Sequence, residues 1–321
     1  MISHLRRIAA FLAFFVATGT AWSQAYPAKA ITIIVPYGAG GGTDTMARYI
    51  AEGLSSRLKQ SVIIENIPGA GGTIAVNKAM NSPADGYVLA VSNGLEFEMQ
   101  QMASGTMPSG KSSTLTPIAL IGTQSMVLVA RPDLGFKSVG DLIAYSKANP
   151  GKLALATSGP GTSLFLAGLM FEKSAGIETL RVPYKSAPQI INDLIGKNVD
   201  VAVLALPSAL TYIQNGQLIA LATTDAQRTS ITPDLPSLSE YPDFQKFDTK
   251  VWYALQGPPG LPSSIAEVVG NAVRDMQKDP QFMARMESLA VVPAKYGTAD
   301  EFVQLKSAQY AAFRNALGLN K

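Results

Sequence analysis

Two hydrophobic patterns alternate along most of the chain. Short apolar runs rich in valine and isoleucine are followed by longer segments in which apolar residues recur every three or four positions. The first pattern is typical of buried strands and the second of amphipathic helices, so we predict an α/β fold with mostly parallel sheets and flanking helices. The predicted strands are 31–35, 61–65, 87–92, 117–121, 125–130, 153–157, 180–183, 199–204, 218–223 and 251–256. The predicted helices are 44–59, 73–80, 138–148, 162–175, 187–196, 207–214, 262–278, 280–289 and 299–316.

The segment from Ile31 to Asp44 is the most informative part of the chain. A β-branched run ends at Pro36, a glycine-rich turn follows, and Thr43 or Asp44 is predicted to open a helix. The first N–H groups of a helix lack intrahelical acceptors and carry partial positive charge, and glycines let a ligand approach them. We therefore expect a small carboxylate or phosphate to bind here, with an ordinary tight turn as the alternative. The candidate ligand-binding residues are Tyr37, Ala39, Gly40, Gly41, Gly42, Thr43 and Asp44.

A second unit of strand, glycine turn and helix follows the predicted strand 153–157. Gly159 and Gly161 form its turn, and Thr162 is a suitable N-cap for the helix. Open α/β sheets bind ligands at the carboxyl ends of their strands, so two such units would hold a small acid between them. The candidates in this unit are Ser158, Gly159, Gly161, Thr162 and Ser163.

Other strand ends supply further candidates for the walls of the site. Ser92 and Asn93 end one predicted strand, and Ala205 and Pro207 follow another. Tyr184 and the Tyr37 already named each lie next to a proline at a strand end. For each tyrosine taken alone, packing at the domain surface is the favoured interpretation.

The N-terminus has the three-part layout of a cleavable secretory signal. Residues 1–25 begin with Arg6 and Arg7, continue through an apolar run shorter than a membrane span, and end in small residues. Cleavage after Ala25 is preferred, although cleavage after Ala21 also fits the pattern. We therefore expect an exported, periplasmic protein without a membrane anchor.

Removal of this signal would also remove the only histidine, His4, and the chain contains no cysteine. Mature protein would then lack the residues for a histidine-based triad, a thiol nucleophile or a thiolate or imidazole metal site. The net charge of +3 falls to +1 without Arg6 and Arg7, which gives no support for nucleic-acid binding. The glycine turns also lack the dinucleotide and P-loop signatures, so we expect no cofactor, no metal and no catalytic residue.

Cleavage after Ala25 leaves 296 residues, more than one hydrophobic core usually holds. We predict two domains: residues 26–125 together with 248–321, and residues 126–247. The chain would cross between them more than once, which implies a hinge and a cleft.

Several motifs, in order and at matching spacing, resemble Bug-type solute-binding proteins of tripartite tricarboxylate transporters. They are Tyr26–Lys29, Ile31–Asp44, Glu65–Gly72, Pro83–Tyr87, Lys147–Leu153, Val182–Lys185, Gly196–Asp200 and Pro207–Leu210. The resemblance implies a type II periplasmic binding protein with two lobes, no catalytic activity, and a carboxylate held mainly by main-chain N–H groups and water at Tyr37–Asp44 and Ser158–Ser163. It also implies integral membrane transporter subunits as partners, and we expect a monomer.

The chain departs from the family pattern after the third predicted strand, where Glu96 and Glu98 replace a stretch rich in threonine and glycine. If Glu96 lined the cleft, it would disfavour a second carboxylate on the ligand, and if it faced solvent it would have no such effect. The alternative functions are a histidine-free exported hydrolase or lyase and a periplasmic sensor that passes its ligand-bound form to a signalling partner.

Overall fold

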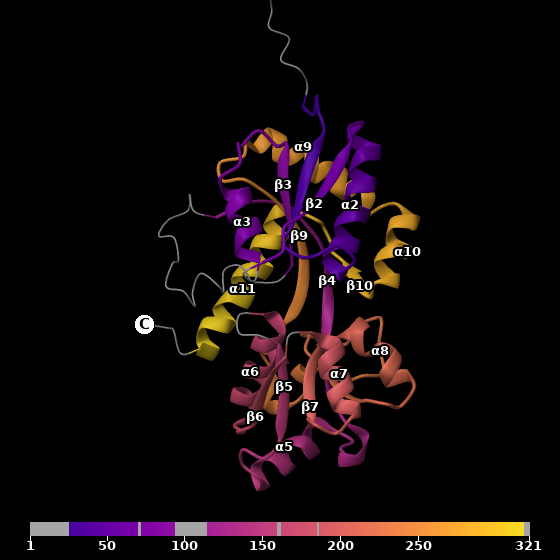
Figure 1. Ribbon diagram of the computed structural model, residues 1–321, viewed down its shortest axis with the longest axis vertical. Coiled ribbons are helices and arrows are strands. Elements are labelled where there is room, and N and C mark those ends of the chain that lie inside the picture. The colour runs from indigo at the N-terminus through magenta and orange to yellow at the C-terminus, as the bar shows by residue number, and fades with distance from the viewer. Residues whose placement is uncertain (1–25, 70–71, 94–113, 159–161, 185, 318–321) are drawn as a thin grey trace, which may run out of the picture.

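A computed structural model describes residues 26–69, 72–93, 114–158, 162–184 and 186–317 of the chain. Its helices and strands form two lobes, one above the other in Figure 1, and the long strands β4 (Thr116–Ala130) and β9 (Lys250–Gly257) run through the region between them. The predicted signal peptide, Gly159, Gly161 and Glu96 lie outside the described residues.

The first lobe is built on the strand order β2-β1-β3-β9-β4, with β10 on the far edge of β4. Its strands besides β4 and β9 are β1 (Ile31–Val35), β2 (Val62–Asn66), β3 (Val88–Asn93) and β10 (Val291–Pro293). Its helices are α2 (Gly42–Leu58), α3 (Thr73–Met80), α9 (Ser263–Met276), α10 (Pro280–Ser288) and α11 (Ala299–Leu317). Successive residues of β1 point to opposite faces of the sheet. Ile33 packs in the core with α2, and Ile34 packs with α3.

The second lobe repeats this plan with the order β6-β5-β7-β4, and β8 also pairs with β4. Its strands are β5 (Ala154–Ser158), β6 (Leu180–Tyr184), β7 (Val201–Ala205) and β8 (Ile219–Thr223). Its helices are α5 (Val139–Ala148), α6 (Ser163–Ala175), α7 (Ala187–Ile195) and α8 (Leu206–Gln214), with short 3-10 turns η3 (Pro132–Leu134), η4 (Leu238–Glu240) and η5 (Pro242–Phe244). Leu155 packs with α6 and Ala156 with α7, so this sheet is also covered on both faces.

The predicted α/β architecture with two lobes is confirmed, and the strand directions refine it. The outer three strands of each lobe are parallel, whereas β4 pairs antiparallel with β7, β8, β9 and β10. A chain that passes between lobes and returns must run in opposite directions through the crossing, which accounts for the antiparallel strands there.

One strand-level prediction was wrong. Residues 117–121 and 125–130 were expected to be separate strands, but both belong to β4. Gly122 does not break the strand, because its missing side chain makes room for β10: a Cβ built at Gly122 would lie 2.6 Å from the carbonyl oxygen of Val292. The short strand β10 was not predicted, and it lies at this point of close approach.

The predicted domain boundaries, 125/126 and 247/248, fall within β4 and just before β9. The division into 26–125 plus 248–321 and 126–247 stays a prediction. A helix contact also joins the two lobes. Helix α11 of the first lobe packs against α6 of the second through the apolar cluster that contains Leu166, Phe302 and Phe313.

Candidate functional site

The sheet topology brings the predicted strand ends to one region, the crossing between the lobes. Met126 of β4 is paired with Ala205, the last residue of β7, and β5 and β6 run parallel to β7. In the first lobe Tyr253, near the start of β9, is paired with Asn93, the last residue of β3, and β1 runs parallel to β3. The carboxyl ends of both parallel sheets therefore point toward the crossing, where open α/β sheets bind ligands.

The first glycine turn presents the N-terminus of α2 to solvent. Gly41 is the N-cap in an extended conformation, φ −78° and ψ 169°, and the helix has no side-chain cap. The helix therefore begins two residues earlier than predicted, at Gly42. Residues 38–42 are all exposed, and Gly40 has a φ of +87°, which a residue with a side chain rarely adopts. Among the residues that the structure describes, no side chain caps the first N–H groups of α2, which are therefore available to an anion.

The buried side chain of Asp44 fixes the conformation of this turn through hydrogen bonds. Its carboxylate accepts hydrogen bonds from Gly40 N (2.8 Å), Arg48 Nε (2.9 Å) and Asn66 Nδ2 (2.9 Å), and the residue is 2% exposed. Burial alone would raise the pKa of Asp44, but the hydrogen bonds from Arg48, Gly40 and Asn66 together hold it below its usual range. Asn66 also donates to the carbonyl oxygen of Tyr37 (3.0 Å). The Asp44 side chain is thus engaged with the protein, so its contribution to a ligand would come through its main chain and through the shape of the turn.

Ser92 and Asn93 lie next to this turn because β3 is the neighbour of β1. Gln256 Nε2 donates to Ser92 Oγ at 2.5 Å, which leaves the serine O–H available as a donor. Asn93 Oδ1 is buried and has no hydrogen-bond partner among the described residues. A buried carbonyl oxygen without a donor is costly, so Asn93 offers an acceptor position at the edge of the site.

The sequence analysis missed Tyr253, which lies beneath the first turn of α2. A Cβ built at Gly42 would lie 3.7 Å from the Tyr253 hydroxyl, which is directed to Gln124 Oε1 at 3.4 Å. Gln124 is itself fixed by a hydrogen bond from Nε2 to the carbonyl oxygen of Leu289 (2.9 Å). The run from Val251 indicated a strand, but no local signal shows which of its residues reaches the turn.

The second turn differs from the first in having a side-chain cap. Thr162 is the N-cap of α6, as predicted, and its Oγ1 accepts a hydrogen bond from Phe165 N at 3.2 Å. The hydroxyls of Ser158 and Thr162 form a hydrogen bond with each other. One of the two hydroxyl protons is used in that bond, so this pair offers at most one O–H donor to a ligand. Ser163 begins the helix. Gly159 and Gly161 of the predicted turn lie outside the described residues.

The remaining candidates have mixed positions. Pro207 lies in the first turn of α8, after the N-cap Ala205, as predicted. Tyr184 is engaged with its own lobe: its hydroxyl donates to Asp193 Oδ2 at 2.5 Å and its ring packs on the apolar core. Burial and the Asp193 carboxylate raise the pKa of Tyr184 to about 12, so it is a neutral residue with a structural role. Contact with a ligand stays a prediction for every residue of the site.

The described residues contain no group of three or more acidic, histidine or cysteine side chains placed to hold a metal ion. Within the same part of the chain, no helix has both the length and the hydrophobicity needed to cross a bilayer. The site thus consists of main-chain N–H groups, hydroxyls and amides, a set suited to binding an anion.

Two α/β lobes with these turns at their facing edges define a two-lobe solute-binding protein. Residues 46–319 match the family described as the tripartite tricarboxylate transporter family receptor, so the chain belongs to that family. It is 34% identical over 291 residues to a UPF0065 protein of Bordetella pertussis, in an alignment that covers 91% of this chain and 89% of that protein. Protein BugT of the same organism is 32% identical over 281 residues, with 85% of each chain covered.

Two solved structures show the same fold. The periplasmic binding protein BugD is 28% identical, with a TM-score of 0.74 over 91% of this chain and 98% of BugD. The R. palustris protein Rpa4515, solved with adipate, is 26% identical, with a TM-score of 0.78 over 91% of this chain and 98% of that chain. The resemblance drawn from the sequence motifs is confirmed. The family and its solved members are solute-binding receptors rather than enzymes.

Proposed function

We propose that this protein captures a small organic carboxylate between its two lobes. The observation that carries the proposal is the exposed N-terminus of α2, whose first N–H groups have no side-chain cap and whose turn is held in place by Asp44. A carboxylate bound there would satisfy these donors and interact favourably with the helix dipole. The hydroxyls of Ser158 and Thr162 would bind its other end from the second lobe.

The ligand class follows from the chemistry of the site and from a relative. Rpa4515 has been solved with adipate, a linear acid with a carboxylate at each end. In the present chain Asn93 Oδ1, which has no partner within the described part of the chain, favours a ligand that also carries a hydrogen-bond donor, such as a hydroxyl or amide group. Glu96 would act in the same direction if it lined the site.

We infer that binding closes the lobes. Residues 26–125 with 248–321 would rotate against residues 126–247 about β4 and β9, and a ligand that contacts both turns would stabilise the closed arrangement. The closed protein, exported with a cleaved signal peptide and acting as a periplasmic monomer, would deliver the acid to the membrane subunits of a tripartite tricarboxylate-type transporter.

The decisive variant is Gly41→Val. Its backbone conformation suits a side chain, and an added Cβ would come no closer than 3.8 Å to Gly38 O, so the fold should tolerate the change. The valine would stand before the helix N–H groups, and we expect binding to weaken at least about 100-fold.

The acid that co-purifies with the protein is first identified by native mass spectrometry, and its affinity, with adipate as a second probe, is then measured by calorimetry. Gly140→Ala, in the first turn of α5 and distant from the site, is the matched control and should bind normally. Small-angle scattering of wild-type protein should show a more compact molecule at saturation. Wild-type affinity in folded Gly41→Val would refute the carboxylate site.

A further inference from the structure

A cavity of about 330 Å³ lies beside the crossing strands and is bounded by both lobes. Thr123 of β4 and Val292 of β10 line it from the first lobe, residues 226–230 line it from the second, and Asp225 and Lys250 stand where the chain crosses. We call residues 37–44, the glycine turn before α2, the ligand-side turn. Gln124 and Tyr253 face this turn. Because side chains alternate along a strand, Thr123 and Lys250 lie on the opposite face of β4 and β9. The cavity therefore lies on the opposite face of the crossing strands from the candidate site.

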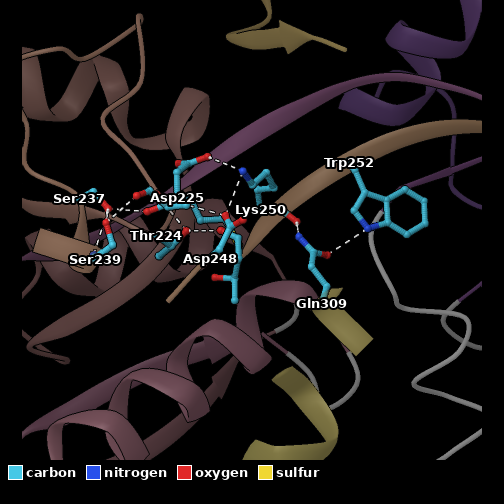
Figure 2. A network of polar contacts seen from close by, with 11 residues as sticks. Thr224, Asp225, Ser237, Ser239, Asp248, Lys250, Trp252 and Gln309 are labelled. Atoms are coloured by element: carbon cyan, nitrogen blue, oxygen red, sulfur yellow. Dashed lines mark hydrogen bonds and ion pairs between the residues drawn. The ribbon is translucent and has the colours of Figure 1, made fainter. Parts of the chain in front are cut away.

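The main chain at this crossing is well hydrogen-bonded. Thr224 N donates to Met126 O (3.1 Å), Thr249 N donates to Thr224 O (2.8 Å), and Thr224 Oγ1 donates to Thr249 O (2.6 Å). Figure 2 shows how Ser237 and Ser239 add hydroxyl donors to this region and how Gln309 of α11 joins the main chain of Lys250 to Trp252. The end of β8 and the start of β9 are thus held together.

The side chain of Asp225 is poorly satisfied by comparison. The residue is 8% exposed, its closest charged partner is Lys250 Nζ at 3.8 Å, and that ammonium group lies nearer to Asp248, at 2.9 Å (Figure 2). Asp225 Oδ2 is buried without a hydrogen-bond partner among the described residues. Ser125 and the main chain of Asp225 favour the ionised form, but they do not compensate for burial of a carboxylate with one unpaired oxygen.

The other groups near Asp225 do not supply the missing charge. Ser125 of β4 faces the carboxyl group, and β10 contributes only the apolar Val292 to the cavity. Arg228, on the segment after β8, lines the same cavity but is paired with both carboxylate oxygens of Glu240 at 2.8 Å. Burial raises the pKa of Asp225 to about 6, although Lys250 and Ser125 oppose the shift and Asp248 adds to it.

We propose that Asp225 is a proton-operated control of the hinge: proton uptake on its carboxyl group stabilises the lobe arrangement described here, and proton release favours a rotated arrangement in which the carboxylate reaches water. The partners of Asp225 come from different elements, namely β4 and β9 at the crossing and the segment after β8. Rotation of the lobes about the crossing strands would move these partners apart and expose the side chain to water. The arrangement that binds the proton more tightly therefore becomes more populated as the pH falls.

The sign follows from linkage. The arrangement in which Asp225 has the higher pKa binds its proton more tightly, so it gains population as the pH falls through about 6. If the carboxyl group has an ordinary pKa in the rotated arrangement, the ratio of the two arrangements changes about 30-fold between pH 7.5 and pH 4.5.

The proposal rests on the lobe rotation inferred above, but not on ligand binding. The test therefore measures the distance between the lobes without any ligand, so its failure can be told apart from a failure of the carboxylate site. The chain has no cysteine, so Ser56→Cys on α2 and Ala144→Cys on α5, both exposed, can carry a pair of dyes for single-molecule energy transfer. We expect the distribution of transfer efficiencies to shift with a midpoint near pH 6. Asp225→Asn, added to this pair, should show the low-pH distribution at every pH.

Asp275→Asn is the matched control, because Asp275 is an exposed acid paired with Lys278 on the first lobe. It should shift as the wild-type pair does. Carbon-13 spectra of wild-type protein keep the test decisive even if Asp225→Asn fails to fold: the Asp225 carboxyl resonance should titrate near pH 6. A titration midpoint below pH 5, or a pH-independent distribution in the wild-type pair, would overturn the proposal.

Discussion

The glycine turn before α2 and the proposed hinge each bury an aspartate, and the surroundings of the two carboxylates differ. Asp44 accepts three hydrogen bonds and has a lowered pKa, whereas Asp225 has one buried oxygen without a partner among the described residues and a raised pKa. Both residues are less than a tenth exposed to solvent, but Asp225 lies deeper among protein atoms and loses more hydration. Asp44 also has Arg48 bonded directly to its carboxylate at 2.9 Å, whereas the ammonium group nearest to Asp225 is 3.8 Å away. Depth, donors and a bonded cation together account for the opposite shifts of the two pKa values.

The largest expected effect comes from removing the charge at the hinge. Asp225→Asn should raise the free energy of unfolding at pH 7.5 by as much as about 3 kcal/mol, because the wild-type acid is ionised there at the expense of stability. A raised pKa means that this penalty is complete above pH 6 and disappears as the pH falls toward 4. Urea titrations should therefore show a difference in the free energy of unfolding between the two proteins at pH 7.5, and a smaller difference at pH 4.5.

Removing the Asp44 side chain, which fixes the ligand-side turn, should instead lower the free energy of unfolding. Asp44→Ala leaves the N–H of Gly40 without its acceptor and removes one of the two acceptors of the Asn66 amide, which still donates to Tyr37 O. We expect a loss of about 2 kcal/mol together with loss of ligand binding. The lowered pKa of Asp44 means that its contribution is present above pH 4 and is lost as the pH falls through the lowered value. Asp275→Ala, on the exposed ion pair with Lys278, is a control that should change stability little. Equal stability of Asp44→Ala and wild-type protein in urea at pH 7 would show that the turn does not depend on this residue.

The sequence predicted what has a local signal. Met46, Ala47, Ile50 and Leu54 recur at helical spacing and are all buried on α2, and Thr162 occupies the N-cap that its residue type favours. The family motifs indicated the two turns, and the elements around them lie where their patterns placed them. These features are set by residues close together in the chain, so a single sequence contains the information.

Long-range contacts were not predictable in the same way. Asp44 was predicted as part of the ligand-binding turn, and this role stays a prediction. The hydrogen bond to its carboxylate from Asn66, 22 positions away in the chain, was not predicted. Tyr253 reaches the turn only because β9 returns from the second lobe, and the hinge cluster joins Asp225 to Lys250 across 25 positions. Such pairs depend on which strands become neighbours, and neither composition nor periodicity specifies that.

The smallest expected effects come from two threonines: Thr162, at the turn before α6, and Thr223, near the proposed hinge. Thr162→Val removes the hydroxyl that caps Phe165 N on α6, and the loss of an N-cap should cost about 1 kcal/mol and weaken ligand binding several-fold. Thr223→Val removes a hydroxyl that is fully buried in β8 and has no hydrogen-bond partner among the described residues. Valine has nearly the same shape and suits a strand, so stability should stay the same or rise by up to about 1 kcal/mol.

Urea denaturation of the two variants beside wild-type protein measures both signs in one experiment. A clear loss of stability in Thr223→Val would mean that the hydroxyl is satisfied in solution, and the hinge would then not be short of donors as Asp225 indicates. Opposite signs for the two threonines would show that the Thr162 hydroxyl stabilises the turn before α6, whereas the Thr223 hydroxyl is buried without a compensating hydrogen bond.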